Sequence, residues 1–339
     1  MAEKLTMADI AELAGVTKST VSRYFNGGSI KEETRKKIQN VVEENNYIPN
    51  SFARLKAKES NTVGVIVPTL NSKVTSRVVT SIGRYLRSQG YEALIKDSDH
   101  SPKLELENIN RLFTQKVDGI LFSAISLTEE HKQLLMNSPV PVVVLAQNFE
   151  EGITVTMDDY TAGKTMGSFM GSRVHGKIAY LGVDEEDEAV GIFRRQGVLE
   201  GIKESGSQVM TVETGDYSYV SGQEMMEKVL EKGIPDGVIC ATDRLAFGAY
   251  RILQKHGILI PEQVSVAGFG GYDESELLSP QLTTLRFDSY GLGYLGAETL
   301  LKMIREEPVP ITNRGDSYNR DRKTKIGTGY TTKCGHISQ

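Results

Sequence analysis

The stretch that decides the fold of the first part of the chain is TMADIAELAGVTKSTVSRYFN, residues 6–26. Thr6 is a suitable helix N-cap with an acidic residue three positions later, and apolar residues recur at helical spacing until Gly15 ends the segment. Thr17 can cap a second short helix over residues 18–25. Two short helices joined by a glycine turn predict a helix-turn-helix.

A third helix and a linker are predicted to follow. Ser29 and Glu32 form a capping box ahead of a segment with an apolar stripe, so residues 1–49 are expected to fold as a three-helix head. Residues 50–61 hold few large apolar side chains and several basic ones. This composition is typical of a linker that becomes helical when it docks.

Beyond Thr62 the pattern changes to short apolar runs that alternate with helical stretches. The predicted strands are 63–67, 93–95, 119–122, 142–145, 177–183, 237–242 and 264–268, and the predicted helices are 76–89, 104–114, 162–173, 192–204, 222–231 and 245–256. Such alternation predicts an α/β fold with doubly wound parallel sheets.

Two lobes are expected, with a ligand bound between them at the carboxyl ends of the strands. The first lobe should hold residues 62–158 and 290–310, and the second residues 159–289. Residues 311–339 show no apolar period of either kind, so an irregular and disordered tail is predicted.

Composition sets the broad class of the protein. Of 339 residues, 39% are hydrophobic and 24% charged, which is typical of a folded globular chain. No apolar run approaches the roughly 20 residues that cross a bilayer, and the first residues do not have the pattern of a secretory signal. We therefore expect a cytoplasmic protein without a membrane partner. Cys240 and Cys334 lack ligand-like neighbours, so no metal site is expected.

Charge is distributed unevenly. Residues 1–58 carry 10 Lys or Arg against 7 Asp or Glu, whereas the remainder carries 29 against 37. A polyanionic partner would therefore meet the head, because phosphate contacts depend on local positive charge.

The residues of the head, together with Thr34-Arg35 and NYIPN at 46–50, resemble the LacI/GalR family of transcriptional regulators. The resemblance covers about residues 5–310. It implies a homodimeric repressor that binds a pseudo-palindromic double-stranded DNA operator. It also implies a core with the two-lobed periplasmic-binding-protein fold, in which a small sugar or sugar phosphate alters DNA binding. The tail lacks a heptad pattern, so a dimer is expected rather than a tetramer.

The second helix of the head would enter the major groove, where Arg and Lys can pair with guanine edges. Lys18, Ser19 and Arg23 are the expected base-reading residues. The resemblance adds further DNA contacts in the head and in a hinge that wedges into the minor groove: Thr6, Thr17, Ser22, Asn26, Asn50, Ala53, Arg54 and Leu55. The hinge is one residue shorter than usual, so Leu55 lies one position early.

The resemblance also implies residues that bind the effector. Arg194, in an Arg-x-x-Gly motif, would donate to ligand hydroxyls or carboxylates, and Tyr217 would stack on the ligand ring. Asp158, Thr242 and Asp243 match the acceptor positions of the family. Ser72, Ser123 and Gln147 are further candidates assigned by spacing.

One departure from the family pattern is informative. Relatives usually carry Gly, an aromatic residue and two Asp at the last strand of the site, whereas this chain reads GFGGYD over residues 268–273, which moves the carboxylate to Asp273. With YFNGGS at 24–29 and AVG at 189–191, this sequence resembles the branch of sucrose-operon repressors.

Other classes of protein are less well supported. Gly291-x-Gly293-x-x-Gly296 satisfies the dinucleotide fingerprint, but the following strand with its acidic ribose partner is missing, so close helix packing explains the glycines better than an oxidoreductase does. No nucleophile motif or histidine cluster points to an enzyme, and no cofactor is expected. The alternative is a stand-alone cytoplasmic carbohydrate-binding protein with impaired DNA binding.

Overall fold

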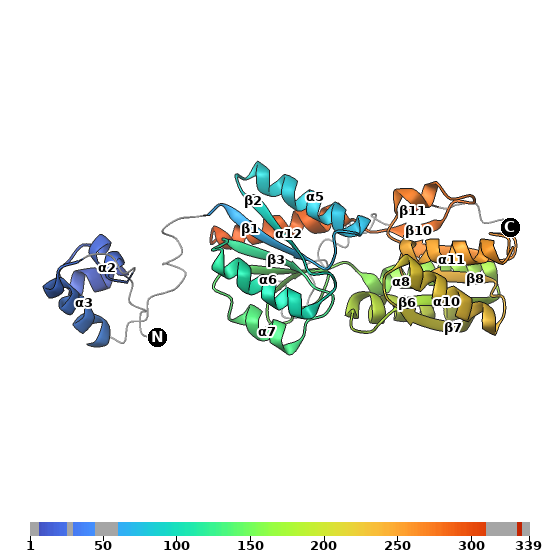
Figure 1. Ribbon diagram of the computed structural model, residues 1–339, viewed down its shortest axis with the longest axis horizontal. Coiled ribbons are helices and arrows are strands. Elements are labelled where there is room, and N and C mark those ends of the chain that lie inside the picture. The colour runs from blue at the N-terminus through green and yellow to red at the C-terminus, as the bar shows by residue number, and fades with distance from the viewer. Residues whose placement is uncertain (1–6, 26–29, 45–59, 310–330, 334–339) are drawn as a thin grey trace. The chain divides into compact units, whose positions relative to one another are not determined.

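The computed structural model describes residues 7–25, 30–44, 60–309 and 331–333 (Figure 1). The chain divides into two compact units, Met1–Glu59 and Ser60–Gln339, which we call the head and the core. Among the described residues, none of the helices is long and apolar enough to cross a membrane.

The head consists of three helices: α1 (Met7–Leu13), α2 (Lys18–Phe25) and α3 (Glu32–Glu44). Gly15 has φ +65°, a left-handed conformation that lets the chain turn sharply between α1 and α2. Val16 then donates its backbone N–H to the carbonyl of Ala11, 2.9 Å away. Buried residues from all three helices form the core of the head: Ile10, Ala11, Ala14, Val21 and Ile38. The predicted helix-turn-helix is confirmed.

The third helix begins at Glu32, whereas a capping box at Ser29 would begin it about two residues earlier. Ser29 itself lies outside the described residues.

The first half of the core is built on a five-stranded parallel sheet with the order β2-β1-β3-β4-β5, and we call it the first lobe. Its strands are β1 (Thr62–Val67), β2 (Glu92–Asp97), β3 (Gly119–Ser123), β4 (Val142–Leu145) and β5 (Ile153–Val155). Its helices are α5 (Lys73–Ser88), α6 (Pro102–Thr114), α7 (Glu129–Met136) and α12 (Ser289–Ile304). The helix α12 comes after the second half of the core in sequence and packs against α5 in the first lobe (Figure 1).

The second half of the core, the second lobe, is built on a six-stranded sheet with the order β11-β10-β9-β8-β6-β7. Its strands are β6 (Lys177–Val183), β7 (Gln208–Gly215), β8 (Gly237–Cys240), β9 (Ser265–Phe269), β10 (Thr283–Arg286) and β11 (Thr331–Lys333). Its helices are α8 (Asp159–Val174), α9 (Arg195–Glu204), α10 (Tyr219–Lys232) and α11 (Asp243–Lys255), with a π-helix η1 (Glu188–Arg194) and a 3-10 turn η2 (Asp273–Glu276).

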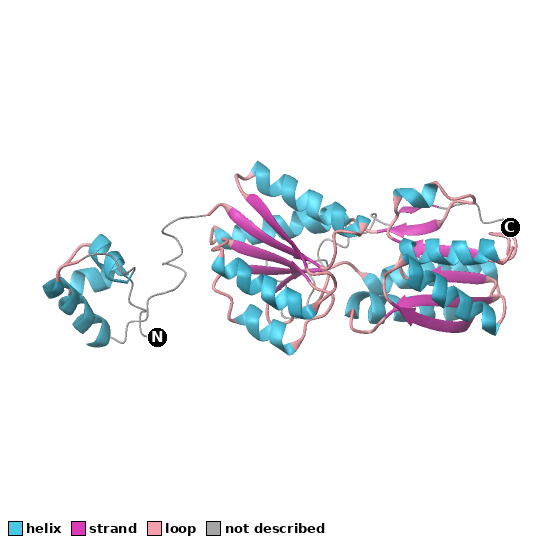
Figure 2. Ribbon diagram, viewed as in Figure 1, coloured by secondary structure: helices cyan, strands magenta, loops and turns pink. Residues whose placement is uncertain are grey.

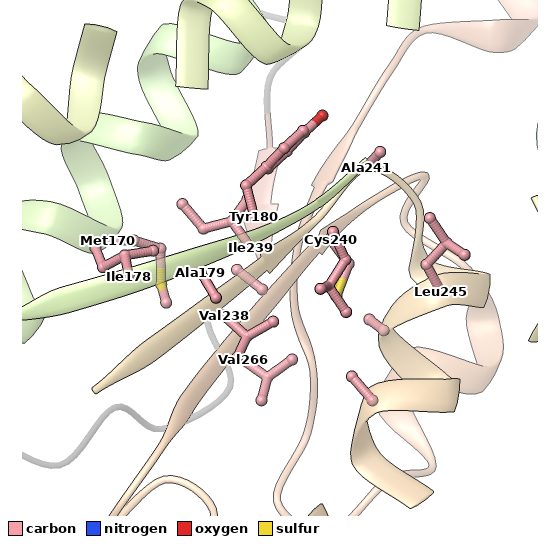
Figure 3. Packing of buried hydrophobic residues seen from close by; sticks show 14 of the residues in the cluster. Met170, Ile178, Ala179, Tyr180, Val238, Ile239, Cys240, Ala241, Leu245 and Val266 are labelled. Carbon is pink, nitrogen blue, oxygen red and sulfur yellow. The ribbon is translucent and has the colours of Figure 1, made fainter. Parts of the chain in front are cut away.

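Helices cover both faces of each sheet (Figure 2). The central strands of the second lobe are therefore mostly apolar. Ile178 of β6 packs beside Met170 of α8, whereas Ala179 and Val238 lie on the opposite face of the sheet, and Cys240 is fully buried in the same apolar cluster (Figure 3). Burial raises the pKa of the Cys240 thiol far above its ordinary value, because the thiolate would lose its hydration. The α/β fold with two parallel-sheet lobes is confirmed.

The tail differs from its prediction in one place. Thr331–Lys333 form β11, which pairs antiparallel with Arg286–Thr284 of β10. The sequence showed no strand pattern here because a three-residue edge strand needs no apolar alternation. The rest of residues 310–339 lies outside the described part of the chain.

Candidate functional site

The second helix of the head separates a buried face from a polar one. Val21 is fully buried, whereas Lys18, Ser19 and Arg23 are exposed. At 100° per residue, the three exposed positions fall within about 140°, with Ser19 and Arg23 roughly 160° from Val21 and Lys18 roughly 60° from it. The structure therefore brings the three predicted base-reading residues together on one solvent-facing surface.

Thr17 holds the start of this helix. Its Oγ1 accepts a hydrogen bond from the backbone N–H of Thr20 at 3.3 Å and lies 2.9 Å from the Ser19 hydroxyl. An N-cap of this kind accepts a hydrogen bond from one of the backbone N–H groups of the first turn, which have no partner within the helix. Six of the other DNA-contact candidates lie outside the described residues: Thr6, Asn26, Asn50, Ala53, Arg54 and Leu55. Ser22 lies in α2, but its side chain is not among those described.

The predicted effector residues belong to the core, and among them Arg194 is a buried cation. Its Nε and Nη2 donate to Oδ1 of Asp159 at 2.9 and 2.5 Å, and its Nη1 donates to the carbonyl of Ala241 at 2.7 Å. The guanidinium also lies 5.0 Å and 4.8 Å from the ring centres of Phe269 and Phe287. Three of its five N–H donors are thus used within the second lobe.

Asp159 and Arg194 form a buried ion pair, since their side chains are only 5% and 7% exposed. Burial raises the pKa of Asp159, and the Arg194 guanidinium opposes that rise. Burial likewise disfavours the charged form of Arg194, but Asp159 more than offsets this and the pKa of the guanidinium is raised. Each group therefore favours the charged form of the other.

A second buried carboxylate connects the two lobes. Oδ1 of Asp187 accepts a hydrogen bond from Nε2 of Gln147, in the first lobe, at 2.9 Å and from the backbone N–H of Val190 at 3.0 Å. Its Oδ2 accepts a hydrogen bond from the hydroxyl of Tyr217. Gln147 also donates to the carbonyl of Ile125 at 2.7 Å. These residues follow strands of both sheets, so they lie where a ligand between the lobes was expected.

Tyr217 takes part in a stacked contact with the other lobe. Its ring lies 5.6 Å from that of His100, with 17° between the ring planes. Burial, and then the neighbouring Asp187 carboxylate, raise the pKa of Tyr217 well above its ordinary value, so its hydroxyl remains a donor at neutral pH. Asp99 and His100 both have positive φ, 46° and 56°, a conformation that non-glycine residues adopt at a cost.

Asp243 is fully buried and belongs to the framework of the second lobe. It accepts hydrogen bonds from the backbone N–H of Tyr272 at 2.8 Å, from the Ser275 hydroxyl at 3.0 Å and from the Thr284 hydroxyl at 2.5 Å. Burial raises its pKa, and the three hydrogen bonds oppose that rise. Thr242, beside it, caps α11 by accepting from the N–H of Leu245 at 3.2 Å.

Several other candidates have local roles or lie at the surface. Ser72 caps α5, with its hydroxyl 3.4 Å from the N–H of Thr75 and 3.5 Å from the Tyr272 hydroxyl of the second lobe. Asp158 caps α8 by accepting from the N–H of Thr161 at 3.1 Å. Ser123 ends β3 and is half-buried, and the Asp273 side chain is 78% exposed.

Sequence reasoning missed Asp159, Asp187 and His100. Asp187 lies within the acidic run DEEDE at residues 184–188, which has the composition of a solvated loop. Its position just after a buried strand was the available signal, because the carboxyl ends of parallel strands are where ligand sites form. Within the described residues, no cluster of His, Cys, Asp and Glu is arranged to hold a metal ion.

Comparisons with known proteins agree with this division of the chain. The family described as "Bacterial regulatory proteins, lacI family" matches residues 6–50. The family described as "Periplasmic binding proteins and sugar binding domain of LacI family" matches residues 60–330.

Similar proteins cover almost the whole chain. The sucrose operon repressor of Staphylococcus xylosus is 30% identical over 308 residues, which are 89% of this chain and 95% of that protein. Catabolite control protein A of Priestia megaterium is 32% identical over 313 residues, 90% of this chain and 94% of that protein. Among solved structures, the complex of the transcriptional regulator CelR with cellobiose matches with a TM-score of 0.66 and 25% identity, covering 90% of this chain and 94% of that one.

Proposed function

The chain belongs to the LacI family of bacterial regulatory proteins, and we propose that it is a transcriptional repressor whose binding to operator DNA is controlled by a small sugar. The relatives are transcriptional regulators and not enzymes. The observation that carries the proposal is the polar surface of α2, where Lys18, Ser19 and Arg23 are exposed while Val21 of the same helix is buried.

This face has the chemistry that reads DNA. An α-helix fits the major groove, and Arg or Lys can donate two hydrogen bonds to the O6 and N7 atoms of guanine. Phosphate contacts from the rest of the basic head would supply affinity without sequence preference. A homodimer would place two such heads on the two halves of a pseudo-palindromic operator in the cytoplasm.

The interlobe residues support a polyhydroxyl effector. Asp187 and Gln147 offer carboxylate and amide groups, and Tyr217 offers an aromatic face, which together suit the hydroxyls and the flat apolar side of a sugar ring. Two similar proteins are a sucrose operon repressor and a regulator solved as its complex with cellobiose. We propose sucrose, or a sugar or sugar phosphate related to it, as the effector. The effector would act through its different affinity for two arrangements of the core.

The test is a fluorescence anisotropy titration of the full chain against labelled DNA from its own upstream region, with a random duplex of equal length. Arg23→Ala should lose about 1–3 kcal/mol of specific binding free energy, because a bidentate base contact carries that magnitude. The control is Lys37→Ala, an exposed lysine of α3, which should weaken both duplexes alike.

Equal losses on both duplexes for Arg23→Ala would contradict base reading by that residue. Release of the wild-type complex by sucrose, fructose or one of their phosphates would identify the effector. Sugar binding without any specific DNA binding would favour the alternative, a stand-alone carbohydrate-binding protein.

A further inference from the structure

The two lobes contact each other directly at the start of α5 and the loop after β9. Arg77, on α5 of the first lobe, donates from Nη1 to the carbonyl of Gly270 at 2.8 Å and from Nη2 to the carbonyl of Gly271 at 2.7 Å. Its side chain is 12% exposed, and its Nη2 also lies 3.5 Å from the carboxylate of Asp273. One guanidinium of the first lobe therefore donates hydrogen bonds to two consecutive backbone carbonyls of the second.

The loop that offers these carbonyls depends on its two glycines. Gly270 and Gly271 have φ +134° and +56°, which other residues rarely adopt. A Cβ atom at Gly270 would lie 2.7 Å from the Tyr272 ring, and one at Gly271 would lie 2.6 Å from Nε of Arg286. The acceptor loop for Arg77 therefore depends on two successive glycines in conformations that a side chain would disturb.

The second lobe holds this loop in place. The backbone N–H of Gly270 donates to the carbonyl of Leu285 at 2.9 Å, and that of Gly271 donates to the Thr284 hydroxyl at 3.0 Å. The same Thr284 hydroxyl donates to the buried Asp243. The loop is thus held as a fixed pair of acceptors for Arg77, and the carbonyl of Gly271 also accepts from Nη2 of Arg286 in the second lobe at 2.9 Å.

Two further contacts flank Arg77. Lys73 lies 3.0 Å from Glu274, and Nη1 of Arg244 donates to the carbonyl of Asn71 at 2.9 Å. The Lys73–Glu274 pair is about half exposed on both sides, and such surface pairs contribute little. The contact of Arg77 is less exposed than that pair and uses two N–H groups of one guanidinium, so it is the stronger of these two charged contacts.

We propose that Arg77 is a positioning residue that holds the two lobes together without an effector and so sets the balance that the effector shifts. The second part of this statement rests on the proposed function. The effector would contact Gln147 of the first lobe and Tyr217 of the second, so it would bind the closed arrangement. Its apparent affinity would then scale with the fraction of closed molecules.

The first experiment needs neither DNA nor sugar. Spin labels are attached to cysteines introduced at Lys103 and Glu224, exposed residues of the first and second lobe, in a full chain with Cys334→Ser. The chain is diluted with unlabelled protein, and distances are measured by pulsed electron paramagnetic resonance. Wild type should give one narrow distance. Arg77→Gln should add a second, longer distance, because losing a bidentate charge-assisted contact shifts the closed-to-open ratio by about ten- to a hundredfold.

The controls distinguish a specific role of Arg77 in joining the lobes from a general loss of structure. Arg84→Gln removes an exposed arginine of the same helix and should leave the distance unchanged. Arg77→Lys keeps the charge but cannot serve both carbonyls as a planar fork, so it should fall between wild type and Arg77→Gln. Circular dichroism identifies any variant that fails to fold. An unchanged distance distribution in both folded Arg77 variants would overturn the proposal.

The second experiment measures sucrose affinity by calorimetry on the same variants. Arg77→Gln should raise the apparent dissociation constant by the factor by which the closed fraction falls. An unchanged dissociation constant beside an altered distance would show that Arg77 has only a structural role, and would overturn its role in the response. If wild type binds no sucrose, the proposed effector is wrong, and the distance measurement alone decides whether Arg77 joins the lobes.

Discussion

The buried pair of Asp159 and Arg194 allows a sharp test of what this arginine does. If Arg194 were mainly a sugar ligand, replacing it would abolish the response to the effector and leave the fold intact. The structure indicates a larger cost, because the guanidinium is the partner of a fully buried carboxylate. Removing one member of such a pair costs about 3–5 kcal/mol, since the other charge stays buried without compensation.

A comparison of single and double variants measures how strongly Asp159 and Arg194 depend on each other in the free energy of unfolding. Arg194→Met and Asp159→Asn should each lower the free energy of unfolding by about 3–5 kcal/mol, because each leaves the other member of the pair buried without its counter-charge. The double variant Arg194→Met, Asp159→Leu should be close to wild type, as hydrophobic replacements of buried ion pairs often are. The carbonyl of Ala241 loses one donor in both Arg194 variants, so that contribution cancels in the comparison.

The assay is urea unfolding of the full chain followed by circular dichroism, with sucrose binding measured beside it. A loss below about 1 kcal/mol for Arg194→Met, or losses that simply add in the double variant, would refute the reasoning, since residues in direct contact should couple. A stable double variant that no longer binds sugar would assign Arg194 both roles.

Two further predictions concern the framework of the core. Gly167→Ala should destabilise the protein by about 1–3 kcal/mol, as overpacking does, because a Cβ there would lie 2.2 Å from the carbonyl of Val198 on α9. Gly83→Ala, where nothing lies within 4 Å of the new Cβ, should instead stabilise α5 by about 0.5–1 kcal/mol. Thermal melts should therefore show a lower melting temperature for Gly167→Ala and a higher one for Gly83→Ala. Burial acts to raise the pKa of Glu213, but hydrogen bonds from Lys232 and Thr211 outweigh it, so the pKa is lowered in the folded protein. The ionised carboxylate therefore stabilises the fold above the ordinary pKa of about 4.3, and this stabilisation is lost as the pH falls. The free energy of unfolding of Glu213→Gln should therefore fall less steeply than that of wild type between about pH 5 and pH 3, and parallel slopes in urea titrations would contradict the assignment.

The sequence predicted the elements whose burial leaves a clear pattern. Strands β1, β3, β4, β6 and β8 are nearly continuous apolar runs because helices cover both of their faces. The prediction omitted β7, whose residues 208–215 are mostly half-buried or exposed and carry polar side chains at the sheet edge. It also omitted β5 and β11, because three residues are too few to show a period.

The effector site was harder to predict because the side chains of adjacent residues point in different directions. Asp158 and Asp159 are adjacent in the sequence, yet Asp158 caps α8 and Asp159 is buried against Arg194. The predicted helix began at residue 162, three residues after its observed start, and each residue turns a helix by 100°. An error of that size leaves the direction of either carboxylate undetermined, so only the coordinates could show which acid meets the arginine.

The first lobe is completed by a helix that is synthesised after the second lobe. Leu292, Leu295, Leu300 and Leu301 of α12 belong to the apolar cluster that also contains Val78, Ile82 and Leu121. While a ribosome makes the chain, strands β6 to β10 can pair in the order in which they emerge, because they are contiguous apart from their own helices. The first lobe must wait with its apolar face uncovered until residue 304 has emerged. The half of the core made first is thus the last to close, and nascent chains that pause before α12 are where association with chaperones is expected.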